Sequence, residues 1–330
     1  MTMTRRALAA SALALFLAAA PLNAALAEPL TIQMTGQHRG VVVGERYAIP
    51  TYHVNFITSQ QATSVVSIGA RTRLAMVLEG VDEATLRRLA DEAYADLRGQ
   101  MEAAGLSLMS IEETRAMTQA AGFEEIPGNM EVSGIGPGIT IGSSVRKGWV
   151  TVGPQAAPAL NAFRTLRSTM GISGQIGAIT AIQPFNRRPE TVNGVVLAPS
   201  LTIDFARMEA ARGGMFGGAA RASGNVALGV LSTSPVMAYR TTRVGLGTPG
   251  SFAPRADVFS NTPFAQVVEG GAAVRAGPSF STTVDANYQA VQRARGDAVV
   301  VDLPVWEGLV RDAYRGYNAG IVQAITSVRR

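Results

Sequence analysis

Three side chains in the sequence have the type and the position for chemistry: His53, Asp204 and Asp302. His53 lies on one face of an alternating apolar segment, where its imidazole could serve as a general base. Asp204 and Asp302 lie in or beside apolar segments with the character of strands, and a carboxylate at a strand end can line a ligand crevice. Together these residues are the candidates for a hydrolase that uses carboxylates or His53.

A structural role is the alternative for these candidates. A single histidine on the polar face of a strand is commonly a half-exposed side chain that takes part in no reaction. Asp302 comes just before a segment with helical periodicity, where a carboxylate caps the first turn by accepting amide hydrogens. The sequence leaves the catalytic and the structural interpretation open.

Other motifs that carry chemistry are incomplete. The chain has two histidines, no cysteine and no H-E-x-x-H, so it lacks the usual ligands of zinc. Residues 171–175 approach the serine elbow G-x-S-x-G but end in glutamine. Ser144 and Lys147 match S-x-x-K without its partner motifs, and the glycines at 134, 136 and 138 lack phosphate-loop spacing. We therefore predict neither a cofactor nor a metal site.

Residues 1–27 have the pattern of a cleaved export signal. Arg5 and Arg6 form a short basic head, an apolar run follows over residues 7–20, and Ala25 and Ala27 give the small-x-small pattern of a cleavage site before Glu28. Because the chain has no cysteine, it lacks the residue that lipidation would modify. We therefore predict a periplasmic or secreted product that is soluble and not a lipoprotein.

The composition is typical of a packed globular protein. Hydrophobic residues make up 47% of the chain and charged residues 16%. After the leader no stretch reaches the about 18 uncharged apolar residues that a transmembrane helix needs. The net charge of +5 falls by two when Arg5 and Arg6 leave, and the remaining basic residues are scattered, so we predict no nucleic-acid binding.

The clearest local pattern is a βαβα unit over residues 64–122. Residues 73–81 are apolar on both faces, as in a central strand. Asp82 is then placed to cap a helix whose apolar residues form a single stripe. Residues 106–109 predict a short strand, and Ser110, with a glutamate three positions later, predicts the capping box of a second helix. Strands alternating with helices imply parallel pairing through a right-handed crossover.

The rest of the chain has a weaker pattern. Residues 123–150 are rich in glycine, and residues 156–170 predict a short helix. Residues 208–224, rich in glycine, alanine and arginine, predict a surface loop. Residues 298–301 predict a buried strand, and a long apolar stripe after Asp302 predicts a helix that runs to the C-terminus.

These elements predict an α/β protein, with α+β as the alternative. The expected architecture is a mixed sheet that contains the βαβα unit of residues 64–122, further strands with glycine-rich hairpins, and a C-terminal helix packed on the sheet. Residues 28–330 are long enough for one large domain or for two closely packed α/β domains with a boundary near residues 123–150.

The order of elements over residues 64–122 resembles the small α/β domain of periplasmic envelope proteins, including the curli secretion channel subunit and the amino-terminal domain of the Tol–Pal β-propeller protein. The missing lipidation cysteine departs from the curli channel subunit. The resemblance implies a non-catalytic cell-envelope protein that acts by binding other envelope proteins or by self-assembly. A periplasmic solute-binding protein and a hydrolase that uses carboxylates or His53 are the alternatives.

Overall fold

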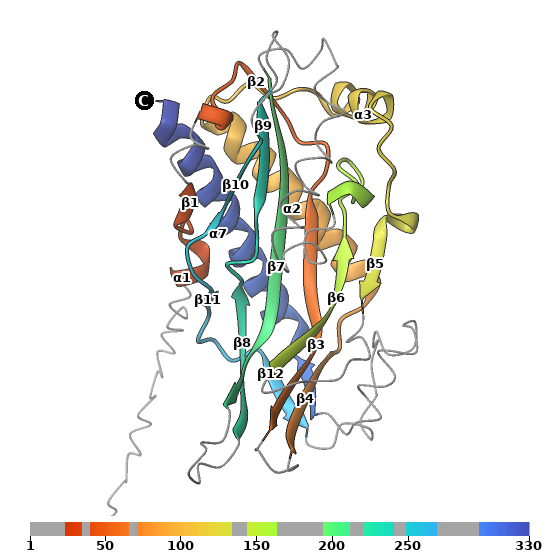
Figure 1. Ribbon diagram of the computed structural model, residues 1–330, viewed down its shortest axis with the longest axis vertical. Coiled ribbons are helices and arrows are strands. Elements are labelled where there is room, and N and C mark those ends of the chain that lie inside the picture. The colour runs from red at the N-terminus through yellow and green to blue at the C-terminus, as the bar shows by residue number, and fades with distance from the viewer. Residues whose placement is uncertain are drawn as a thin grey trace, which may run out of the picture.

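The computed structural model of the chain describes residues 24–34, 40–65, 71–133, 144–163, 194–211, 221–240, 249–268 and 297–329. Thirteen strands of these residues form one mixed sheet (Figure 1). Its main path runs through β1 (Ile32–Met34), β10 (Pro249–Pro254), β9 (Val236–Arg240), β7 (Gly194–Ala211), β3 (His53–Val65), β4 (Arg71–Glu79), β13 (Asp297–Val301) and β12 (Ala265–Val268).

The sheet branches at its two longest strands. On β3, the strand β6 (Ser144–Val152) pairs antiparallel and carries β5 (Met130–Ser133) on its far side. β7 likewise pairs with two strands outside the main path, β2 (Arg46–Ala48) and β8 (Arg221–Val230). β8 in turn pairs with β11 (Val258–Phe259). The pairs β3/β7, β4/β13 and β2/β7 are parallel and the others antiparallel, which confirms the predicted mixed α/β sheet.

Two long helices, α2 (Glu83–Ala103) and α7 (Leu303–Arg329), lie side by side against the sheet (Figure 1). α2 begins where the sequence predicts, because the Asp82 carboxylate accepts a 2.8 Å hydrogen bond from the Thr85 amide. The shorter α3 (Ile111–Ala120) begins with the predicted capping box. The smaller helices are α1 (Ala24–Ala27) and the 3₁₀ turns η2 (Pro127–Asn129) and η3 (Asn161–Phe163). Among the described residues, no helix combines the length and the apolar character needed to cross a membrane.

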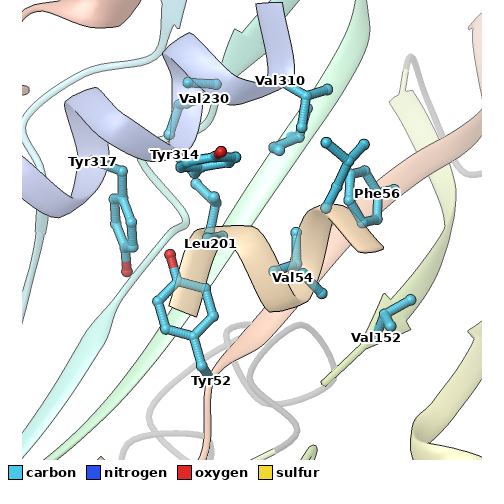
Figure 2. Close-up of a cluster of buried hydrophobic side chains, with 14 of the residues drawn as sticks. Tyr52, Val54, Phe56, Val152, Leu201, Val230, Val310, Tyr314 and Tyr317 are labelled. Atoms are coloured by element: carbon cyan, nitrogen blue, oxygen red, sulfur yellow. The ribbon is translucent and has the colours of Figure 1, made fainter. Parts of the chain in front are cut away.

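The main hydrophobic core lies between these helices and the sheet. Figure 2 shows side chains of β3, β6, β7 and β8, with Tyr52 just before β3, gathered with those of α7; the labelled residues are Tyr52, Val54, Phe56, Val152, Leu201, Val230, Val310, Tyr314 and Tyr317. The rings of Phe56 and Trp306 lie 6.0 Å apart. Burial of each large side chain of this kind contributes about 1.5–3 kcal/mol, so this layer is what joins α7 to the sheet.

A hydrogen-bond network centred on one buried amide crosses this core. Asn318 of α7 is fully buried; its side-chain amide donates to the Ala93 carbonyl and to Asp96 of α2, each at 2.9 Å. Its carbonyl oxygen accepts from the Tyr52 hydroxyl, also at 2.9 Å. Because an unsatisfied buried amide is costly, this network fixes the relative position of α2, α7 and the segment that leads into β3.

Residues 106–109 do not form the strand that the sequence predicts. Leu108 makes only an isolated parallel bridge to Tyr47. The parallel neighbour of β4 is instead β13, more than 200 positions later in the sequence. A local pattern could predict that β4 is central, but it could not identify so distant a partner.

Two other elements differ from their predictions. Within residues 208–224, strand β7 continues to Ala211 and β8 begins at Arg221, with Met208 paired to Gly224. Gly224 lies close to the side chains of Leu74 and Met76, so its missing side chain lets β8 pass over β4. The described part of the predicted 156–170 helix, up to residue 163, forms turns and η3; the remainder lies outside the described residues.

The predicted boundary near residues 123–150 interrupts neither the sheet nor the core. One buried cluster includes Leu86 and Met101 from before this segment and Val230 and Tyr317 from after it. β6, inside and just beyond the segment, pairs with β3 along most of its length. The two sides of the segment therefore share one sheet and one core.

Candidate functional site

A pocket of about 540 Å³ lies between residues of β6, β7 and β11. Its walls come from β6, β7, β11 and the turns beside β8 and β11; they are Lys147, Ala206, Arg207, Met208, Glu209, Ser232, Asp257 and Phe259. We call it the Lys147 pocket. Its volume falls within the about 300–1,000 Å³ that small-molecule sites usually have.

The wall at Lys147 is backed by a buried carboxylate. Asp204 is completely buried, and its Oδ2 lies 2.6 Å from the Lys147 Nζ. Its Oδ1 accepts hydrogen bonds from the Gln60 side-chain amide at 2.5 Å and from the backbone amide of Phe205 at 2.8 Å. The same Gln60 amide group donates to the Ala206 carbonyl at 2.7 Å. A carboxylate, a lysine and a glutamine from three strands thus meet at one point.

Irregular strand pairing explains why these residues meet. The β3/β7 ladder ends at Phe56 and Ile203, and β7 then continues against β8 with a register shift between Asp204 and Ala206. Such a shift leaves backbone groups without ladder partners. Gln60 and Asp204 satisfy backbone groups of residues 205 and 206, while the β3/β6 register places Lys147 directly opposite Gln60, on the same face.

Burial raises the pKa of the Asp204 carboxyl above its usual range, and the Lys147 ammonium opposes that shift. The Lys147 side chain is 31% exposed, so the ammonium reaches both the buried carboxylate and the pocket. The side-chain oxygen of Gln60 is buried without a hydrogen-bond partner beside this pair. The arrangement offers an N–H donor to a ligand, with a fixed counter-charge behind it.

The rest of the pocket wall carries charges of both signs. Asp257 accepts hydrogen bonds from the Ser232 amide at 2.6 Å and from its hydroxyl at 2.7 Å, which fixes one carboxylate at the rim. Arg207 and Glu209 lie 3.6 Å apart on β7, each with a side chain 67% exposed. At that exposure the two side chains are free to turn toward a bound molecule at little cost.

His53 lies away from this pocket, at the other end of β3. It is 1% exposed, and its Nε2 accepts a hydrogen bond from the Leu160 amide at 3.1 Å. A nitrogen that accepts an amide hydrogen carries no proton of its own and is closed to a substrate. The sequence pattern favoured a half-exposed histidine, whereas the residue is buried because residues on both sides of β3 cover this strand.

Asp302 lies at the start of α7, exposed to solvent. Its side-chain oxygen accepts from the Val305 amide at 3.4 Å, and its carbonyl accepts from the Trp306 amide at 2.9 Å. These contacts are those of a helix cap. The structure therefore does not bring His53, Asp204 and Asp302 together, and only Asp204 lies beside the Lys147 pocket.

The sequence did not indicate Gln60 as a candidate, and it indicated Lys147 only through an S-x-x-K match that lacks its partner motifs. One further signal was present: Lys147 is the only lysine among 29 basic residues, in a chain that otherwise uses arginine. No sequence pattern indicated Gln60, since its role depends on the register of the strands.

Among the described residues, no group of three or more histidine, cysteine or acidic side chains is placed to bind a metal ion. Comparisons of the chain with family models, curated proteins and solved structures found no match.

Proposed function

We propose that the chain is an exported protein of the bacterial cell envelope that binds a small polar solute in the Lys147 pocket without transforming it. The leader pattern of residues 1–27 supports export. The observation that carries the binding role is the pocket itself, a concave site with a lysine ammonium fixed in its wall. This favours the solute-binding alternative among the functions that the sequence leaves open.

The charges of the pocket wall indicate the class of solute. Lys147 and Arg207 suit a carboxylate, whereas Glu209 and Asp257 suit an ammonium group. A solute with one group of each sign would complement both pairs. We therefore propose a small zwitterion, such as a free amino acid or a dipeptide.

The same contacts favour binding over catalysis. A lysine that acts as nucleophile or base needs a free amino nitrogen aimed at the substrate, whereas the Lys147 Nζ lies 2.6 Å from the Asp204 carboxylate and is held in an ion pair. The Asp204 carboxylate is completely buried behind Lys147, where a substrate has no access to it. Both groups are thus suited to fixing a binding surface.

The test is calorimetric titration of the purified protein with a panel of amino acids and dipeptides. Arg207→Gln and Glu209→Gln should each weaken binding about tenfold, which corresponds to about 1.4 kcal/mol. Arg255→Gln, a change at an exposed arginine outside the Lys147 pocket, should leave the affinity unchanged. The proposal fails if no zwitterion binds, or if the two β7 variants bind as well as the native protein.

Protein–protein binding is the second candidate, and the edge strand β12 favours it. β12 pairs with β13 on one side and with no other strand of the described residues. Val267 of this strand is a large hydrophobic side chain that is 46% exposed. An exposed edge with an apolar side chain can add a strand from another chain. Size-exclusion chromatography tests this role: Val267→Asp should dissociate an oligomer, and Gln266→Asp, at its exposed neighbour, is the control.

A further inference from the structure

Two glycines of α7 mark a place where the chain's own amino-terminal segment approaches the helix backbone. A Cβ atom at Gly316 would overlap the carbonyl oxygens of Leu26 and Glu28. A Cβ atom at Gly320, one turn later, would overlap the carbonyl oxygen of Leu30. The absence of both side chains therefore opens a groove along α7 that residues 26–30 occupy.

The amino-terminal segment is fixed in this groove by burial and by hydrogen bonds. Leu26 is completely buried and belongs to the main core cluster, and Leu30 is 4% exposed. The Leu30 amide donates to the Gly316 carbonyl at 2.9 Å, within α7. Residues 32–34 then continue as β1, which pairs with β10. The segment is thus an integral part of the fold from Leu26 onward.

The position of Leu26 bears on where the leader is removed. A cut between Ala27 and Glu28, as the small-x-small pattern indicates, would take Leu26 away from the core. A chain that loses a buried leucine loses the burial energy and leaves a cavity that its surroundings fill only in part. Gly316 would then keep its contact with Glu28 but lose the closer one with Leu26.

We propose that the exported protein retains Leu26 and that the leader is cut at a bond between Ala20 and Leu26. This inference rests on the proposed export. The host's leader peptidase would hydrolyse one peptide bond: water adds across it, leaving a carboxylate on the leader and an amino group on the product. Ala18 and Ala20 give a second small-x-small pattern upstream, and Ala25 gives a small residue directly before Leu26.

The direct test is the intact mass of the full chain expressed with its leader and recovered from the periplasm. We expect a product that begins between residues 21 and 26. A product that begins at Glu28 would overturn the inference. A chain that stays uncut in the cytoplasm would instead contradict the proposed export, so the two failures are distinguishable.

Two variants sharpen this test. Leu26→Ala leaves the small residues at 25 and 27 in place, and it should lower the melting temperature of the exported product by about 5 °C, because a buried leucine is truncated. An unchanged melting temperature would mean that Leu26 had been removed. Ala27→Asp places a charge at an exposed position and should leave processing unchanged. An uncut precursor of this variant would place the cut after residue 27 and overturn the inference.

Discussion

Lys147 and Asp204 form an ion pair in which only the lysine reaches solvent. Replacing Lys147 with methionine would leave the buried carboxylate without its counter-charge, so we expect the free energy of unfolding at pH 7 to fall by about 3 kcal/mol. Equilibrium unfolding in urea would measure this loss. Arg255→Met, at an exposed arginine, should change the free energy of unfolding by less than about 0.5 kcal/mol.

The pH dependence of that loss gives a second readout. Burial raises the pKa of Asp204 in the folded protein, so the folded state binds this proton more tightly than the unfolded state does. The stabilisation that this proton provides is fully present below the pKa that Asp204 has in the unfolded protein. It is lost as the pH rises through the pKa that Asp204 has in the folded protein. Without Lys147 the folded pKa rises further. The loss in Lys147→Met should therefore shrink toward pH 4, and an equal loss at pH 4 and pH 7 would contradict the assignment.

The sequence predicts residue roles where both partners are close along the chain. Asp82 caps the amide of Thr85, and Ser110 exchanges hydrogen bonds with Glu113, three positions away in each case. The site at Asp204 depends on three strands whose register no local pattern specifies. Its acidic residue could be selected as a candidate, because a carboxylate in an apolar strand is unusual, but no local pattern pairs it with Lys147, 57 positions earlier.

At the scale of elements, four charges join α2 to α7. Glu92 lies between Arg88 at 2.7 Å and Arg311 at 2.9 Å, and both arginines also contact Glu307. Desolvation would raise the pKa of Glu92, but its hydrogen bonds to Arg311 and Arg88 outweigh that effect and lower it. The Glu92 carboxylate thus stabilises the fold above the pKa that it has in the unfolded protein. This stabilisation is lost as the pH falls through the pKa that Glu92 has in the folded protein.

Glu92→Gln should therefore lower the free energy of unfolding by about 1 kcal/mol at pH 7, a modest value because the side chain is 32% exposed. As the pH falls through the folded pKa of Glu92, the variant and the native protein should approach equal stability, because the native carboxylate then becomes protonated in both states. Urea unfolding over a series of pH values from 7 downward measures this. Glu112→Gln, at an exposed carboxylate of α3, is the control, and a loss that persists at low pH would refute the network.

The glycines of α7 allow a comparison within one helix. Gly308 has open space where a Cβ would lie, so Gly308→Ala should raise the free energy of unfolding by up to about 1 kcal/mol through helix propensity alone. At Gly316 the same change meets the backbone of Leu26 and should lower it by at least about 2 kcal/mol. Thermal denaturation of both variants tests this, and a stabilised Gly316→Ala protein would mean that the segment does not lie in the groove.

Sequence patterns predict helices better than strand neighbours in this protein. The buried residues of α2 and α7 follow the apolar stripes, because helical periodicity is a local property. The strands β4 and β13 were each recognisable as buried, but their parallel pairing joins opposite ends of the chain. Gly316 and Gly320 carry no local sign of their function, since the segment that they accommodate lies almost 300 positions earlier.

At the scale of the whole molecule, β3 lies at the centre of the sheet and pairs with β4, β6 and β7. Its buried face contributes to the core that contains α7, while its partners come from both sides of residues 123–150. Because β3 pairs with strands from both sides of this segment, unfolding of one side would remove hydrogen bonds and packing from the other. We therefore expect the described fold to unfold as one cooperative unit.

The two tryptophans allow that cooperativity to be measured, because Trp149 lies on β6 and Trp306 on α7. In Trp306→Phe the fluorescence reports only on β6, and in Trp149→Phe only on α7. Within each variant the urea midpoint from fluorescence should equal the midpoint from far-ultraviolet circular dichroism, since one core includes both elements. Midpoints that separate in either variant would show two independent domains, as the glycine-rich segment near residues 123–150 had suggested.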